Sequence, residues 1–527
     1  MKRLLIIAVS TLLVFPAGAQ SLQEIYRISE QNSSFSTARS SAMGGAFGSL
    51  GADAASVNAN PAGLGMYRSS EVSITPSVQV ASVISSSVGG EAIDVKKRHA
   101  TVNLNNLSVI FNKYDKSMSS SKFGVRGFTF GITYNQLANY RTRQRAESSS
   151  SGMSIADMFG AQLFGIDPKN LYDANVPQRA FQTYPVSQWG AIEAYQTGLV
   201  FDVTDNPYQY SPSYTDADTG LPVGSLVHGD RVYPELYRRM SGNMGEYSFA
   251  GGINLGDKIY IGMTLGIQSF QFDQYDYYVE TAAATNVGDL VQLRYMQWLT
   301  MSGASFSFKF GVAAEPVKGL RIGAAVHAPT IHNISEEYSS GMDNYYLNNQ
   351  NYSSYSVYAP NDYKVRTAPR FIGGVSYTFG TRGVISFDYE CIWYNAMRVR
   401  GLNYLPGQPT INDEIRTVYR PTNNYRVGAE AVIIPGVYLR GGYSFYANAN
   451  KTQDDKYGNV QNITGGIGFR NRFFFLDLAY VHTHSEQAPF RYFSYNDPYF
   501  GDTLQSDSEI ATKLNNSNII LTLGIKF

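Results

Sequence analysis

Charged side chains recur at alternate positions in several segments of this chain, and their types could hold a ligand or transfer a proton. A cation such as Arg370 or Arg440 could bind a ligand carboxylate through charge-assisted hydrogen bonds. The same charges could instead pair with one another, which is how charged groups normally survive burial, and we favour this interpretation. The charges at these positions are Arg321, Arg370, Asp388, Glu390, Arg426, Glu430, Arg440 and Asp477.

Two of these carboxylates, Asp388 and Glu390, are separated by a single residue and would share one face of a strand. Such a pair could act as an acid and a base. An enzyme of this kind would also need a nucleophile beside a base, and the sequence contains no Ser/His motif that would supply them. We therefore predict that the chain is not an enzyme.

Histidines offer a different chemistry, because one histidine can ligate haem iron. His327 and His332 lie close in sequence, as do His482 and His484, and the latter two share a parity that would face outward or into a loop. Six histidines in 527 residues are no enrichment. We predict neither a metal site nor a cofactor, and a haem-binding receptor stays an alternative. The single cysteine, Cys391, excludes a multi-cysteine zinc site.

The elements that would position these groups are strands with one apolar and one polar face. At the carboxy terminus, Ile519, Leu521, Leu523, Ile525 and Phe527 share one parity, and only Ile520 breaks the alternation. In a soluble sandwich the apolar face would meet a second sheet, whereas in an outer-membrane barrel it meets lipid. Charges avoid the apolar parity throughout, as a lipid-facing wall requires.

The amino terminus favours the membrane interpretation. Residues 1–19 combine a basic start, an apolar run and the small residues Ala17-Gly18-Ala19, which predicts a signal peptide and a mature chain in a bacterial envelope. The apolar run is shorter than the roughly 20 residues that a transmembrane helix needs. Residence in the membrane would therefore depend on strands.

Alternating segments predict about fourteen strands. Every second connector is short, whereas the others include 146–244, 338–362 and 488–510. Short periplasmic turns and long extracellular loops are typical of bacterial barrels, and an even count places both ends in the periplasm. The predicted strands lie near 70–81, 99–112, 123–145, 245–255, 258–280, 290–314, 319–337, 363–379, 383–400, 415–433, 437–450, 459–470, 472–487 and 511–527.

Composition agrees with one continuous barrel. The 40 Tyr, 29 Phe and 49 Gly suit aromatic girdles and small lumen-facing residues. The 42 basic and 42 acidic residues balance, so no basic footprint for nucleic acid is present. No Pro/Ser-rich linker divides the chain. We predict an all-β transmembrane antiparallel barrel in the outer membrane, surrounded by its lipid and monomeric.

The segment before the first strand carries a specific motif. Residues 36–47 (STARSSAMGGAF), 51–56 (GADAAS) and 60–64 (NPAGL) resemble the amino-terminal hatch of the FadL/TodX family of outer-membrane transporters, as a Bacteroidota-type member would. Residues 320–335 resemble the family more weakly. The resemblance implies a hatch at 20–69 that plugs the lumen of a fourteen-stranded barrel at 70–527.

The resemblance also implies a function. Extracellular loops would capture a hydrophobic small molecule, such as a long-chain fatty acid, and a lumen pocket would pass it to a lateral opening gated by the hatch. We expect Asn60, Pro61 and Ala62 to carry the gating, because Pro fixes φ and Asn can bond to nearby backbone. The candidate ligand contacts in the lumen are Arg321, His327, Arg370 and Arg440.

The insert at 146–244 has two interpretations of equal weight. Its aromatic residues, such as Phe159 and Trp189, could form a hydrophobic landing groove, or they could form the small core that a long loop needs. A kink for the lateral opening would be easiest in a Gly-containing strand such as 125–135. A further alternative is an interaction protein of a secretion system, whose envelope partners would bind the Tyr/Asn-rich loops at 339–362 and 488–507.

Overall fold

The computed structural model describes residues 22–30, 36–88, 93–115, 124–173, 175–205, 208–216, 218–219, 221–402, 410–497, 501 and 503–527. The predicted signal peptide at 1–19 lies outside the described residues. No helix in the described part of the chain is both long and apolar enough to cross a membrane.

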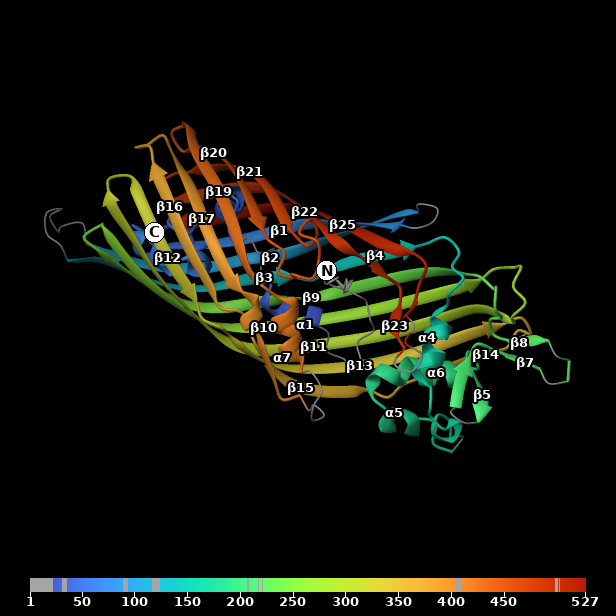
Figure 1. Cartoon of the computed structure of the whole chain (residues 1–527). Coiled ribbons are helices and arrows are strands. Elements are labelled where there is room, and N and C mark those ends of the chain that lie inside the picture. Colours follow the sequence, from blue (N-terminus) through green and yellow to red (C-terminus); the bar gives the residue numbers. More distant parts are fainter. Residues whose placement is uncertain are drawn as a thin grey trace, which may run out of the picture.

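The chain forms a closed antiparallel β-barrel of 14 strand positions (Figure 1). Closure is direct, because the last strand pairs with the first from Glu71↔Lys526 to Val88↔Glu509. The strands of the wall are β1 (Glu71–Val88), β2 (Asp94–Tyr114), β3 (Val125–Asn139), β4 (Thr142–Glu147), β9 (Val232–Leu255), β10 (Ile259–Ala282), β11 (Leu290–Val317), β12 (Leu320–His327), β13 (Ile331–Tyr346), β15 (Ala359–Arg366), β16 (Arg370–Thr378), β17 (Gly383–Trp393), β18 (Arg398–Arg400), β19 (Pro421–Ile434), β20 (Val437–Tyr446), β21 (Val460–Arg470), β22 (Phe474–Arg491) and β25 (Glu509–Lys526).

The predicted fold class is confirmed, and each predicted segment contains a strand of the wall. Several boundaries differ. The strand predicted at 245–255 begins already at Val232, so residues 232–244, which were expected in the insert at 146–244, belong to β9 of the wall. The segment predicted at 415–433 begins with helix α7 (Ile411–Val418) and becomes strand β19 only at Pro421. Thr410 and Asp413 form a capping box that starts this helix. The capping box favours a helix at the amino-terminal end of the segment predicted at 415–433, in place of the strand that its period-2 pattern indicated.

Several positions of the wall consist of two strand segments in succession. β12 and β13 are separated at 328–330, β16 and β15 at 367–369, and β17 and β18 by the 3₁₀ turn η4 (Tyr394–Ala396). Pro329 and Pro369 occupy two of these breaks. Proline has no N–H to donate to a ladder, so it interrupts a strand where it occurs.

Apolar side chains point outward around the wall and form a belt. On β10 the outward residues Met263, Leu265 and Ile267 are exposed, and on β11 Phe306 is 80% exposed. A continuous exposed apolar surface of this extent is typical of contact with lipid rather than with water. The protein is therefore an integral outer-membrane barrel. Its short turns lie at the end that carries the chain terminus labelled C in Figure 1.

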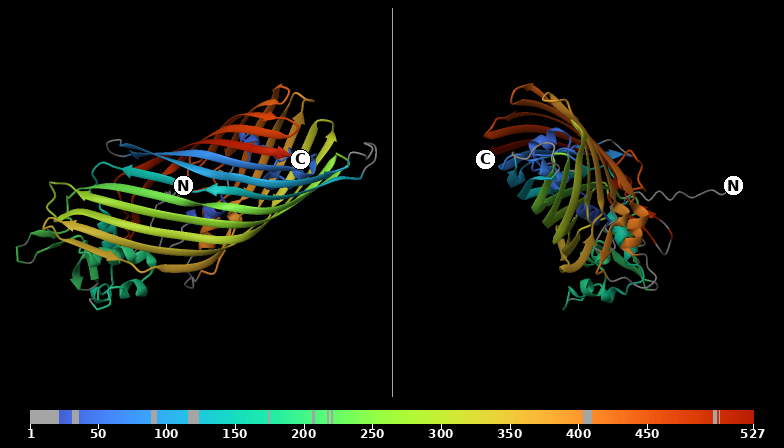
Figure 2. Two further views of the ribbon diagram at one scale, coloured as in Figure 1. Left: turned by 180° about the vertical axis from the view of Figure 1, so that it is seen from behind. Right: turned by 90° about the vertical axis from the view of Figure 1, so that its left-hand side faces the viewer.

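The hatch lies inside the barrel, where its helices appear in blue (Figure 2). α2 contacts β20, β21, β22 and β25, and η1 contacts β9, β10 and β11. Ile520 faces inward and packs against Ala38 and Ala42 of α2, which explains why it breaks the alternation of β25. The hatch elements are α1 (Leu22–Ser29), α2 (Ala38–Ala42), α3 (Ser56–Ala59) and η1 (Pro61–Met66).

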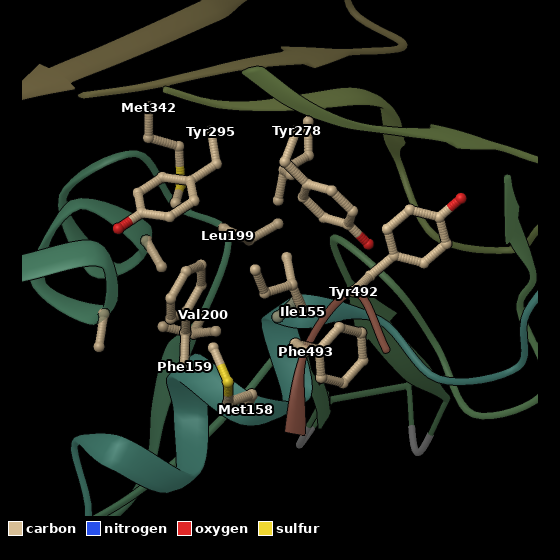
Figure 3. Packing of buried hydrophobic residues seen from close by; sticks show 14 of the residues in the cluster. Ile155, Met158, Phe159, Leu199, Val200, Tyr278, Tyr295, Met342, Tyr492 and Phe493 are labelled. Carbon is tan, nitrogen blue, oxygen red and sulfur yellow. The ribbon is translucent and has the colours of Figure 1, made fainter. Parts of the chain in front are cut away.

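The insert between β4 and β9 forms a small domain at the extracellular end (Figure 1). Its core includes Ile155, Phe159 and Leu199, which pack against Tyr295 of β11 and Tyr492 (Figure 3). Its elements are α4 (Ile155–Gln162), η2 (Pro168–Asn170), α5 (Arg179–Thr183), η3 (Val186–Gln188), α6 (Trp189–Gln196), β5 (Phe201–Asp205), β6 (Tyr208–Ser211), β7 (Ser213–Thr215) and β8 (Pro222–Gly224). Short extracellular strands elsewhere are β14 (Asn351–Tyr355), β23 (Ser494–Asn496) and β24 (Thr503–Gln505).

Candidate functional site

The Asn60-Pro61-Ala62 tripeptide fixes the hatch to the wall. The Asn60 side chain accepts a hydrogen bond from Ala62 N at 3.1 Å and caps η1. Its amide donates to Gly48 O at 2.6 Å and to Val312 O of β11 at 3.2 Å. The side chain thus joins two parts of the hatch to one strand.

Wall glycines make this close contact sterically feasible. A Cβ at Gly311 would stand 1.9 Å from Asn60 Oδ1, and a Cβ at Gly262 would stand 2.1 Å from Pro61 O. The backbone of the hatch therefore packs directly on the backbone of the wall, in a contact that only glycine permits. Such packing holds the tripeptide against the wall, and its role in gating stays a prediction.

A network of ion pairs fastens the other side of the hatch. Arg39 of α2 contacts Glu430 at 3.1 Å, and Arg440 contacts Glu430 at 2.6 Å and Asp477 at 2.6 Å. Arg470 also contacts Asp477, at 2.9 Å. Buried charges are tolerated when their partners are this close.

The residues predicted to contact a ligand lie near this network, in the part of the lumen closer to the short turns, or beside it. Arg370 contacts Glu390 at 3.2 Å, and Arg321 contacts Glu315 at 3.0 Å near the turn between β11 and β12. His327 Nε2 lies 3.4 Å from Ala59 O of the hatch. Their geometry agrees with the structural interpretation, because each of them already has a partner in the protein. Contact with a ligand stays a prediction for Arg321, His327, Arg370 and Arg440.

A seam in the wall separates β2 from β3 and β4. β3 pairs with β2 only from Asn135↔Asn106 to Gly127↔Tyr114. Beyond the rung Asn106–Asn135, toward the extracellular end, the described residues of β3 and β4 pair with β9. They form no ladder with residues 94–105 of β2. The bend follows the register shift at Gln136/Ala138, so it lies just beyond the segment 125–135 in which a kink was expected.

Side chains close the seam where the backbone ladder is missing. Asn139 Nδ2 donates to Gln79 Oε1 at 2.9 Å and to Asn103 Oδ1 at 3.1 Å. Gln144 Nε2 donates to Ser85 Oγ at 3.2 Å and to Thr512 Oγ1 at 3.0 Å. Neutral hydrogen bonds of this kind contribute about 1 kcal/mol each. A closure made of a few such bonds opens far more readily than a continuous ladder.

The hatch reaches the lower end of the seam. Ser36 Oγ donates to Asn135 Oδ1 at 2.8 Å, and the same oxygen accepts from Asn106 Nδ2 at 2.7 Å. Asn135 and Asn106 form the last paired rung of β3 with β2. A movement of the hatch around Ser36 would therefore act directly on the point where the seam begins.

An apolar cluster lies behind the seam in the middle of the lumen. We call it the lumen cluster; it combines Leu137 and Ala138 of the bent part of β3 with Ile25 and Ile28 of α1. Tyr140 packs edge-on against aromatic rings of β10, with centroids 5.8 and 5.6 Å apart. The further members are Met244, Phe270, Phe272, Leu299, Met301, Ile334, Tyr363, Val365, Ile392, Tyr394, Met397, Val399, Ile411, Ile415, Tyr419 and Ala449.

One cation, Arg27 of α1, projects into the lumen cluster. Its guanidinium carbon lies 4.1 Å from the centre of the Phe272 ring, and Nη1 lies 3.0 Å from Met240 Sδ. Within the described part of the chain it has no carboxylate within 4 Å. Glu24 and Glu30 lie one turn away on either side in sequence and act on it electrostatically. The cations fastened to the wall around the hatch, in contrast, have carboxylate partners.

Sequence reasoning missed Arg27 and the polar residues of the seam. Residues 22–29 carry Ile25 and Ile28 at helical spacing, so a short amphipathic helix could have been predicted there. Asn139 and Gln144 gave no comparable signal. Their role depends on partners in β1 and β25, which lie far away in sequence.

The insert buries the aromatic residues that were considered for a landing groove. Phe159 and Trp189 are each 3% exposed, and both belong to the core of the insert. Glu193 of α6 is fully buried in the same domain and accepts from Ser340 Oγ at 2.7 Å. Burial raises the pKa of Glu193 well above its ordinary value of 4.5. The geometry of these residues therefore agrees with the interpretation that they form the core of the insert.

Two histidine pairs considered for haem take separate positions. His332 is buried and faces inward, with Nε2 3.2 Å from Ser305 Oγ. His482 and His484 share the outward parity of Tyr480, and His484 Nδ1 lies 2.8 Å from Asn515 Oδ1. Among the described residues no group of three or more His, Cys, Asp or Glu side chains could hold a metal ion.

Comparison with solved structures confirms the predicted resemblance at the level of the fold. The toluene transporter TodX of P. putida matches with a TM-score of 0.50 and 10% identity over 94% of this chain and 99% of its own. A FadL homologue of Pseudomonas aeruginosa matches with a TM-score of 0.53 and 11% identity over 93% of this chain and 98% of its own. The sequence matches no protein-family model, and none of the curated proteins matches it.

Proposed function

We propose that this barrel is a channel for hydrophobic small molecules, with the lumen cluster as the binding site and the seam between β2 and β3–β4 as the lateral exit. The observation that carries the proposal is the contiguity of the two. Leu137 and Ala138 belong to the cluster, and Asn139, the next residue, closes the seam. TodX, which shares the fold, is by its name a transporter of toluene.

The physical advantage of this route is that the solute avoids water. Apolar surface costs about 25 cal/mol per Å² wherever it meets water. A solute in the lumen cluster is surrounded by apolar side chains, and beyond the seam it meets the lipid that surrounds the belt. Transfer between these two environments carries little of that cost.

The solute in this proposal is fatty acid-like, with an apolar body and one carboxylate. Arg27 is the cation in the lumen cluster that can approach such a carboxylate, and it is partly buried beside Phe272. An Arg–carboxylate pair in an apolar surrounding provides both orientation and affinity. Arg27→Gln should weaken uptake of a fatty acid and leave uptake of toluene unchanged.

The tripeptide Asn60-Pro61-Ala62 holds its part of the hatch against the wall, while α1 and Ser36 occupy the lumen cluster and the end of the seam. In this proposal a solute displaces α1 from the lumen cluster, and loss of the bond between Ser36 and Asn135 releases the end of the seam. Entry takes place at the extracellular end, beside the insert. Transport, rather than catalysis, is the proposed activity.

A cross-link across the seam tests this route. Gln79→Cys and Asn139→Cys, introduced with Cys391→Ser, would be joined by a short bifunctional thiol reagent in whole cells. We expect uptake of labelled fatty acid to fall to the level of cells without the protein, and uptake of the uncross-linked variant to stay near wild type. Unchanged uptake after complete cross-linking would contradict the lateral exit.

A further inference from the structure

A group of cations faces outward on the wall at β15 and β18. Tyr363 and Val365 point into the lumen cluster, so the alternating Lys364 and Arg366 point away from the barrel and are exposed. Val399 is likewise buried, and its neighbour Arg400 is exposed. Register brings them together, because Lys364 pairs with Arg400 across the two strands. We call Lys364, Arg366 and Arg400 the outer cationic patch.

The patch lies immediately above the apolar belt. Below it on the same positions of the wall are the outward residues Val375 of β16 and Trp393 of β17, both exposed. Tryptophan at such a boundary is typical of the level of lipid headgroups. The patch is on the side of the belt away from the short turns, which places it at the outer leaflet.

These cations have no ion-pair partners in the described part of the chain. The acidic groups nearest along the outward face are Asp362 on β15 and Glu337 on β13, further from the belt. In the sequence, residues 403–409, which follow this strand, contain no acidic residue. Arg370 and Arg440 in the lumen are neutralised by carboxylate partners. The cations of the patch have no such partners among the described residues, so their charge can bind an external anion.

A polar notch adjoins the patch at the same height. It is an open hollow of about 480 Å³ on the outer side of β9, β10, β11 and β13. Asn333 of the notch pairs in register with Lys364 of the patch. The side chains of the notch are mainly hydroxyls and amides without charge. Its lining residues are Asn243, Ser269, Phe270, Gln271, Ser302, Gly303, Ala304, Asn333 and Ser335.

We propose that this surface binds a phosphorylated glycolipid of the outer leaflet. The phosphate binds Lys364, Arg366 and Arg400, since guanidinium and ammonium groups are the natural partners of phosphate. The sugar hydroxyls bind the amides and hydroxyls of the notch, and the acyl chains lie along the belt at Phe306. Charge and hydrogen-bonding groups thus lie side by side next to the apolar belt, as the phosphorylated sugar and the acyl chains of one such lipid require.

The proposal is tested with purified full-length protein in detergent, with lipid A and dephosphorylated lipid A as probes and native mass spectrometry as the measurement. The test variant is Lys364→Gln with Arg366→Gln. The control is Lys96→Gln with Arg98→Gln, because these residues have the same types and spacing and are also exposed, on β2. Heat-resistant mobility on gels confirms that each barrel is folded.

We expect the test variant to bind lipid A at least tenfold more weakly than wild type, and the control variant to bind it as wild type does. Dephosphorylated lipid A should bind wild type as weakly as lipid A binds the test variant. The double variant Asn333→Ala with Ser335→Ala should bind both lipids more weakly than wild type does. Equal binding of lipid A by wild type and the test variant, or equal binding of the two lipids by wild type, would overturn the proposal. Uptake of fatty acid is a separate readout, which the Lys364→Gln/Arg366→Gln variant should leave unchanged.

Discussion

Asn139 of β3 donates a hydrogen bond to Gln79 of β1, with Nδ2 and Oε1 2.9 Å apart, although β2 lies between β1 and β3 in the order of the sheet. Such a contact requires β3 to pass on the inner side of β2 above the rung Asn106–Asn135. The wall therefore overlaps itself at this point. Along this stretch, side-chain hydrogen bonds replace the backbone ladder between β2 and the strands β3 and β4.

Removing the side chains that close the seam should open it. We expect Asn139→Ala with Gln144→Ala to leave the barrel folded and to raise the exchange rate of backbone amides in residues 94–105 of β2, because their closure loses bonds worth about 1 kcal/mol each. Hydrogen exchange measured by mass spectrometry checks this. Asn103→Ala alone, which removes one acceptor, is the milder control, and unchanged exchange in the double variant would contradict the role of the seam.

The contact between Asn60 and Gly311 predicts a double-mutant coupling. Gly311→Ala should destabilise the protein by about 1–3 kcal/mol, because the new Cβ overlaps Asn60 Oδ1. Asn60→Ala should partly relieve this overlap, so the double variant should be more stable than the sum of the single effects implies. The measurement is the temperature at which heat-resistant mobility on gels is lost.

Gly251 provides the matched control for this coupling, because a Cβ there would meet nothing within 4 Å. Gly251→Ala should change the transition temperature little. An additive double variant would indicate that Asn60 does not contact the wall at Gly311. If Asn60 is a fixed anchor, Asn60→Ala should also lower uptake while the barrel stays folded.

Replacement of Arg440 distinguishes a structural cation from a ligand contact. Arg440→Gln leaves Glu430 and Asp477 with fewer partners in a buried site, and we expect a loss of about 3–5 kcal/mol in stability. Arg321→Gln, which breaks a more exposed pair with Glu315, should cost less than about 1 kcal/mol. Urea unfolding in detergent measures both. A stable Arg440→Gln variant with impaired uptake would instead support a ligand contact.

Glu193 predicts how the stability of the insert depends on pH. Its pKa in the folded protein is raised by burial, so folding favours the protonated form. Its contribution to stability is complete below pH 4.5, its ordinary pKa, and is lost as the pH rises from there through the folded pKa. Limited proteolysis of the insert should therefore become faster as the pH rises.

Glu193→Gln should remove this dependence, because glutamine keeps the bond with Ser340 and cannot ionise. We expect the variant to resist proteolysis at pH 8 better than wild type and to equal it near pH 4. Asp216→Asn, in an exposed loop of the same insert, is the control and should leave the profile unchanged. A wild-type profile in the Glu193→Gln variant would show that another group is responsible.

The sequence by itself determined the wall of this protein. Alternation of apolar and polar residues is a local pattern with the period of a strand, so it located the strands, the lipid-facing parity and the short turns. The motif at 36–64 located the hatch, and the structure places Asn60 at its contact with β11. Paired charges such as Arg440 and Asp477 were also expected, although their exact partners were not.

Only the tertiary structure decided where the wall is interrupted and what fills the lumen. Ile520 breaks the pattern because it meets Ala38, which is distant in sequence, and no periodicity encodes such a contact. The seam depends in the same way on Asn139 reaching Gln79 across β2. Strand periodicity is a property of neighbouring residues, whereas a gap in a ladder, a buried ion pair or a filled pocket depends on which distant side chains the closed barrel brings together.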